Sequence, residues 1–286
     1  MDANFWLTQL FNGLSYGALL FLLGAGLSLI FGVMRIVNLA HGSYFLLGGY
    51  VAISVIKFTG SWLLAIPVAA SVVALLGLLM ERLFLRQIGF DALRQVLLTV
   101  GFAFLFQQAA LDIWGGENMD IKPPDFVSGT LVTSGLHLPI YRIFMIGIAA
   151  VIGIALWLAM EKTRMGAAVR ATVDDAEMAR GVGIDTSRIS MFIFGLGAFL
   201  AATGGVIGGA FLGIYPGLDF QILPLAFAVV IIGGMGSLGG AAVGALVVGL
   251  ADNLDKALFP EISYFTLYAP MALILAWKPT GLFGRE

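Results

Sequence analysis

Long apolar segments separated by short polar ones run through the whole sequence and restrict the class of protein. The longer segments have the roughly 20 residues that a helix needs to cross a membrane. Only 11% of the residues are charged and the mean hydropathy is +1.00, whereas soluble domains carry about 25% charged residues. The sequence therefore predicts an all-α polytopic membrane protein with about eight or nine transmembrane helices, some short or broken. The expected spans are 5–33, 44–56, 62–80, 96–114, 140–160, 189–214, 222–232, 241–250 and 264–277.

Glycine and cysteine contents narrow this class further. The 38 glycines among 286 residues are about twice the usual ~7%, and small residues let helices approach closely in lipid. We therefore expect one glycine-packed transmembrane domain over residues 1–286. The apolar runs are continuous and do not alternate, which argues against a membrane β-barrel. The chain has no cysteine, which excludes disulfides and thiolate metal sites.

The polar stretch 161–188 lies between two expected spans and holds ten of the chain's 32 charged residues. Its composition from Gly166 to Gly181 favours one amphipathic helix at the membrane surface. Val169, Val173, Ala176 and Ala179 share one face of that helix. The alternative interpretation is a solvated connecting loop.

Two details of this helix are also expected from the sequence. Arg170 and Asp174 are spaced to pair at i, i+4. Gly181 and Gly183 provide a stop, because glycine readily adopts the left-handed conformation that ends helices.

Two further places interrupt the apolar pattern. The first is the polar break with Asn38, His41 and Ser43, and the second is the glycine-rich stretch from Gly233 to Gly240. The polar groups of the first break either line a translocation path or satisfy backbone groups that the break leaves free. The residues that precede the first break are similar to those that precede the second. This similarity indicates either an internal repeat or only close crossings between helices.

The distribution of Lys and Arg predicts the orientation. If 161–188 is cytoplasmic, eleven of the fifteen basic residues, Arg285 among them, lie on that side. The N-terminus is then periplasmic, the C-terminus is cytoplasmic and 115–139 is a periplasmic loop. Such ends require an odd number of crossings, which favours counting 222–250 as two short segments.

Nothing in the sequence indicates catalysis, a metal site or a bound cofactor. His41 and His137 are far apart, no phosphate-binding loop with its Lys is present, and no basic run suggests nucleic acid. Ionisable residues such as Glu81, Asp112 and Asp219 fall at span ends, where they are expected to reach water. The absence of a plain mid-span carboxylate argues against a stand-alone, ion-coupled carrier or channel.

Three motifs resemble one known family. Residues 163–166, 170–171, 175–177, Ala179 and 183–184 look like the cytoplasmic coupling loop of ATP-binding cassette (ABC) importer permeases, and 38–42 and 233–240 resemble the same family. The resemblance covers nearly the whole chain and is to the first, shorter permease subunit of the branched-chain amino acid importers. It implies a bacterial inner-membrane subunit that is not itself an enzyme.

The resemblance also implies partners and substrate. The partners are a second related permease, two cytoplasmic ATPase subunits that bind the ATP, and a periplasmic binding protein, all assembled in membrane lipid. The implied substrates are leucine, isoleucine and valine; related machines carry urea, short amides or aromatic acids.

The resemblance and the breaks give two sets of candidate site residues. The candidates for ATPase coupling are Arg164, Gly166, Arg170, Ala171, Asp174, Ala176, Glu177, Ala179 and Gly183. The candidates for lining the translocation path are Asn38, His41, Ser43, Gly233, Gly236 and Ser237.

Overall fold

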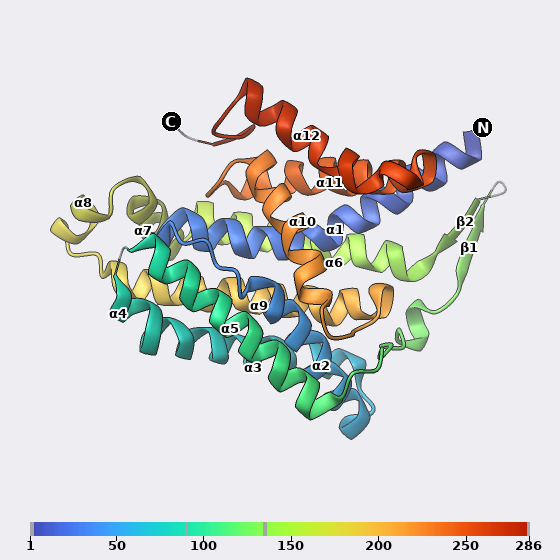
Figure 1. Cartoon of the computed structure of the whole chain (residues 1–286), viewed down its shortest axis with the longest axis horizontal. Coiled ribbons are helices and arrows are strands. Elements are labelled where there is room, and N and C mark those ends of the chain that lie inside the picture. Colours follow the sequence, from blue (N-terminus) through green and yellow to red (C-terminus); the bar gives the residue numbers. More distant parts are fainter. Residues whose placement is uncertain (1–2, 90, 134–135, 285–286) are drawn as a thin grey trace.

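The computed structural model describes residues 3–89, 91–133 and 136–284, and these are mostly helical (Figure 1). Arg285, one of the basic residues in the orientation argument, lies outside them. The helices in this part that are long and apolar enough to cross a membrane are α1 (Ala3–Met34), α2 (His41–Thr59), α3 (Trp62–Met80), α5 (Ala92–Trp114), α6 (Ile140–Lys162), α9 (Thr186–Leu212) and α11 (Leu238–Leu258). The shorter apolar helices are α10 (Leu218–Gly233) and α12 (Ser263–Trp277). The predicted all-α polytopic class is confirmed.

Small elements connect these helices. A π-helical turn, Glu81–Leu85, and the short α4 (Arg86–Ile88) continue α3. The expected loop after α5 contains a 3₁₀ turn, Asp125–Val127, and an antiparallel hairpin of β1 (Thr130–Thr133) and β2 (Leu136–Pro139), in which Thr130 lies opposite Pro139. A second 3₁₀ turn, Pro260–Ile262, precedes α12. This hairpin was not predicted from the sequence.

The core of the molecule is built around α1 and α9. Helix α1 packs on α6, α9, α10 and α11, while α9 packs on α2 and α3. Glycine permits the closest of these crossings: an added Cβ at Gly205 of α9 would lie 1.9 Å from the backbone oxygen of Phe45 on α2. Backbones meet directly there, as the high glycine content predicts.

Both expected interruptions are present. Residues 35–40 are non-helical between α1 and α2, and residues 234–237 separate α10 from α11. The first break returns the chain alongside α1, because Nε2 of His41 donates a hydrogen bond to the backbone oxygen of Leu23 at 3.0 Å. Leu23 lies eleven residues before Met34, about 16 Å along the helix axis. Helix α2 therefore begins about a third of the way back along α1 from its C-terminal end.

The surface helix expected over 166–181 is two helices, α7 (Arg164–Asp174) and α8 (Ala176–Gly181). The prediction of a single helix was wrong, because Asp175 adopts an extended conformation between the two helices and caps α8. Its carboxylate accepts hydrogen bonds from the backbone N–H of Glu177 at 2.9 Å and from that of Met178 at 3.0 Å. A carboxylate that accepts hydrogen bonds from the following N–H groups starts a new helix there, and this competes with continuation of the preceding helix. The glycine stop is confirmed: α8 ends at Gly181, and Gly183 has a φ of +89°.

Candidate functional site

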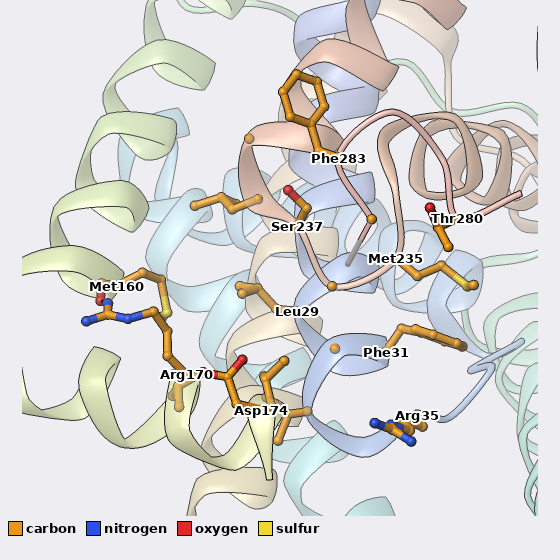
Figure 2. Close-up of a pocket in the computed structure, with 18 of the residues that line it drawn as sticks. Leu29, Phe31, Arg35, Met160, Arg170, Asp174, Met235, Ser237, Thr280 and Phe283 are labelled. Carbon is orange, nitrogen blue, oxygen red and sulfur yellow. The ribbon is translucent and has the colours of Figure 1, made fainter. Parts of the chain in front are cut away.

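A cavity of about 730 Å³ lies where α7 meets the end of α1 and the C-terminal tail (Figure 2). Its walls come from residues 29–35 of α1 and its end, 157–161 of α6, 169–174 of α7, 235–239 after α10, and 279–284 after α12. The cavity thus brings together Arg170 and Asp174 from the coupling candidates with Gly236 and Ser237 from the path candidates. A movement of α7 would therefore change a space that the α10–α11 break also borders.

The first turn of α7 is fastened to the last turn of α6. The Thr163 hydroxyl accepts a hydrogen bond from the Gly166 N–H at 3.0 Å and donates one to the Ala159 backbone oxygen at 2.6 Å. An added Cβ at Gly166 would lie 2.1 Å from the Met160 backbone oxygen, so only glycine fits against α6 at this point. The two helices meet through backbone atoms, which makes the joint stiff.

Arg170 adds a second fastening further along α7. Its guanidinium donates a hydrogen bond to the Met160 backbone oxygen and forms an ion pair with Glu161 at 3.8 Å. The structure therefore joins Arg170 to the end of α6, and its predicted pairing with Asp174 stays a prediction. Cations near the C-terminus of a helix are favoured by its dipole. Arg170 joins α7 to α6 and does not present a free charge.

The apolar face of α7 is packed as predicted. Val169 is buried and Val173 is half-buried, in a cluster that includes Leu29 of α1, Leu156 of α6 and Ile189 of α9. Three spanning helices therefore contact α7, and a force on α7 would reach all of them.

Helix α8 presents a different surface. Ala179 is buried, and its backbone oxygen accepts from the Ile184 N–H at 2.9 Å, which closes the turn after the helix. Met178 and Val182, which are four residues apart, are 67% and 75% exposed. These two residues were not among the predicted coupling residues, although they form an apolar pair at i, i+4 in an otherwise polar segment of the sequence.

The remaining coupling candidates lie around the contacts that join α7 to α6. Arg164 and Glu177 are exposed, Ala171 and Ala176 are half-buried, and Gly183 is exposed in the turn. Their role in ATPase coupling stays a prediction.

We expect Asp175→Ala to loosen α8, because losing an N-cap carboxylate costs about 1 kcal/mol. That energy corresponds to about fivefold faster amide hydrogen exchange across 176–182. The control is Glu177→Ala, which removes an exposed carboxylate of the same helix that does not cap it. Equal exchange rates in the two variants would contradict the capping role.

The polar residues of the first break are buried inside the chain. Asn38, His41 and Ser43 are each at most 1% exposed. The Asn38 side-chain oxygen accepts from the Ala40 N–H at 3.1 Å, so Asn38 serves a backbone group that the break leaves free. His41 binds the α1 backbone through Leu23 as described above. These contacts favour the structural interpretation for Asn38 and His41.

The partner of Ser43 is Asp219, whose position predicted from the sequence was wrong. The Ser43 hydroxyl donates a hydrogen bond to Oδ2 of Asp219 at 2.9 Å, and Asp219 is only 2% exposed. Asp219 was expected at a span end reaching water. It is instead enclosed in the first turn of α10, because α10 begins inside the bundle against α2.

The second break combines a close crossing with a cap. An added Cβ at Gly233 would lie 2.2 Å from the Gly240 backbone oxygen, so α10 and α11 nearly touch there. The Ser237 hydroxyl accepts from the Gly240 N–H at 3.0 Å and starts α11, while its backbone oxygen accepts from Ser28 of α1 at 3.2 Å. Gly236 and Ser237 also border the cavity.

Comparisons with known proteins agree on one kind of membrane protein. The family model described as "Branched-chain amino acid transport system / permease component" matches residues 9–275. The high-affinity branched-chain amino acid transport system permease protein LivH of Escherichia coli K12 is 31% identical, over 98% of this chain and 96% of its own length. The corresponding BraD protein of Pseudomonas aeruginosa is 28% identical over the same shares.

A second kind of permease is also similar. The permease protein LivM of Escherichia coli K12 is 26% identical over 91% of this chain and 67% of its own length. No solved structure shows significant similarity to the chain.

Proposed function

Because the chain belongs to the family of branched-chain amino acid transport permeases, we propose that it forms half of the translocation path of an ATP-driven importer for leucine, isoleucine and valine. The other half is a second, related permease chain, as the similarity to both LivH and LivM suggests. This chain binds no cofactor, and ATP is bound and hydrolysed by two cytoplasmic ATPase subunits. A periplasmic binding protein delivers the amino acid.

The observation that carries this proposal is the stiff joint between α7 and α6. The Thr163 cap, the close contact at Gly166 and the bonds of Arg170 hold α7 against the last turn of a spanning helix. A partner can shift a transport equilibrium only through contacts that differ between the two states. A surface helix joined in this way would transmit such contacts to α6, α1 and α9.

Helix α8 offers the surface for the ATPase. Met178 and Val182 are apolar and exposed, and charged Glu177 and Arg180 flank them. An apolar centre with a polar rim is the usual composition of a protein interface. We place this side, the C-terminus and the cavity in the cytoplasm, and the N-terminus and the β1–β2 hairpin in the periplasm.

The rival functions differ in what they need. The same machine with another binding protein would carry urea, short amides or aromatic acids. A stand-alone carrier would transport with this chain alone and use an ion gradient. The test is uptake into vesicles that contain this chain, the second permease and the ATPases, with the binding protein outside.

We expect ATP-dependent, uphill leucine uptake only with the full set of components. Uphill uptake by this chain alone would show that the proposal is wrong. Uptake of amides, with no uptake of any branched-chain amino acid, would overturn the substrate.

We expect Glu177→Lys to lower the substrate-stimulated ATPase activity of the assembled complex about fivefold, because reversing one charge at an interface rim costs about 1 kcal/mol. Glu177→Gln keeps the length of the side chain and should retain most of the activity. Both variants should extract from membranes in normal amounts, because Glu177 is exposed. Unchanged uptake and unchanged stimulation in Glu177→Lys would reject a docking role for this residue.

A further inference from the structure

Helix α5 exposes polar side chains on a face that a lipid-facing helix would keep apolar. The Gln108 amide donates a hydrogen bond to Oδ1 of Asp112 at 2.8 Å, and both side chains are exposed. Gln108 lies six residues before Trp114, which places it about 9 Å inside the helix end. Helix α6 differs: its exposed residues from Ile143 to Leu158 are all apolar. An amide group at such depth normally faces protein or water.

The start of α10 lies beside this face, within the membrane. The Phe220 ring is 5.4 Å from the Phe104 ring, and Phe104 is twelve residues after Ala92. That separation is about 18 Å along α5, close to its middle. The five residues 213–217, which join the outer end of α9 to α10, therefore descend into the membrane without forming a helix.

Non-helical backbone at membrane depth is tolerated only where protein covers it or a water-filled space borders it. Within this chain the cover is incomplete. Tyr215, Pro216 and Gly217 are half-buried, Phe104 and Phe220 are 57% and 39% exposed, and Gln221 is exposed. Gln221 accepts a hydrogen bond from the Tyr215 hydroxyl at 2.8 Å.

These residues form one surface, which we call the α5–α10 face. Its members are Phe104, Gln108, Asp112, Tyr215, Phe220 and Gln221. We infer that the α5–α10 face lines the water-filled path of the substrate, with a second permease chain on the opposite side of that path. This inference rests on the proposed function and names the surface on which that function depends.

The chemistry of the face fits a small zwitterion with an aliphatic side chain. The amides and the hydroxyl offer donors and acceptors to an ammonium and a carboxylate, while the two phenyl rings offer an apolar contact. Just behind Phe220, the buried Asp219 is held through Oδ2 by Ser43, and its Oδ1 has no hydrogen-bond partner among the described residues.

A second permease chain is the occupant that the observations favour over lipid. Lipid tails cannot hydrogen-bond Gln108, Gln221 or the half-buried, non-helical backbone of 215–217. Permeases of two kinds, LivH and LivM, are both similar to this chain. A path between two chains provides both the water and the cover that this face requires.

The test uses the natural absence of cysteine. In the complete complex in vesicles, Gln108→Cys and Gln221→Cys are treated with a charged, membrane-impermeant methanethiosulfonate, which reacts with thiolates in water. Gly147→Cys on α6 is the control: it is exposed, nothing lies within 4 Å of an added Cβ, and it is seven residues, about 10 Å, inside its helix end.

We expect both face cysteines to react at least tenfold faster than Gly147→Cys, and their modification to reduce leucine uptake. Reaction of both no faster than that of Gly147→Cys, in complexes that still take up leucine with ATP, would overturn the inference and leave the proposed function standing. Fast reaction in a complex whose unmodified form takes up no branched-chain amino acid would support a water-filled path and reject the substrate class instead.

Discussion

Gly166→Ala is expected to lower ATP-driven uptake at least tenfold while the chain still inserts and assembles. The added methyl carbon would lie 2.1 Å from the Met160 backbone oxygen and 2.4 Å from that of Ala159. Backbone atoms at a helix end cannot move aside as a flexible side chain can, so the first turn of α7 must separate from α6. Overpacking of this kind costs about 1–3 kcal/mol. It would also pull the Thr163 cap and Arg170 away from their partners on α6.

The matched control for this variant is Gly181→Ala, which adds the same methyl group at the end of α8. Nothing lies within 4 Å of a Cβ at Gly181, and its φ is not positive. The measurements are leucine uptake and substrate-stimulated ATPase activity in reconstituted vesicles, normalised to the amount of assembled complex. Equal activity of the two alanine variants would mean that the α6–α7 joint does not carry the coupling.

The spans could be predicted from the sequence because lipid imposes a simple rule on it. Every backbone group in the hydrocarbon needs a partner, so an apolar run long enough to cross becomes a helix. Helix α3 begins at Trp62, as predicted, although its π-helical continuation carries the helical chain past the predicted end at Met80 to Ile88. The buried face of α7 was predicted for a related reason, since Val169 and Val173 follow the helical period.

The break between α7 and α8 could not be predicted from helix propensity. Helix propensity over 166–181 favours one continuous helix, but the carboxylate of Asp175 competes for free N–H groups and starts a second one. A propensity scale sums residues independently and does not contain this competition. The stop at Gly181 and Gly183 was predictable, because it depends on the glycines themselves.

The candidate site depends on contacts that the sequence order does not contain. Ser43 and Asp219 are 176 residues apart in the chain and form one hydrogen bond inside the bundle. Asp219 follows the turn at 215–217, so its position in the sequence resembles a span end. Only the descent of 213–217 into the membrane puts it in the interior, and that descent is set by packing of α10 against α2 and α11.

Gly205→Val is expected to have the largest effect on the fold: we expect less than a tenth of the normal amount of folded protein in the membrane. The added Cβ would lie 1.9 Å from the Phe45 backbone oxygen and 3.0 Å from the Gly49 backbone nitrogen. Helices α2 and α9 would have to separate along a crossing that lies in the core. Separating them costs about 3 kcal/mol or more, and in lipid no hydrophobic force between the helices compensates for lost packing.

The control, Gly147→Val on α6, isolates this crossing from a general effect of valine. It adds the same three carbons at another helical glycine, where nothing lies within 4 Å of a new Cβ. Both variants carry the same loss of glycine flexibility and the same β-branched side chain, so a difference between them reports the α2–α9 contact. The measurement is the amount of monodisperse protein extracted in mild detergent and its thermal unfolding midpoint. Comparable yields and midpoints would mean that the bundle accommodates a wider crossing, and the argument from direct backbone contact would then be wrong.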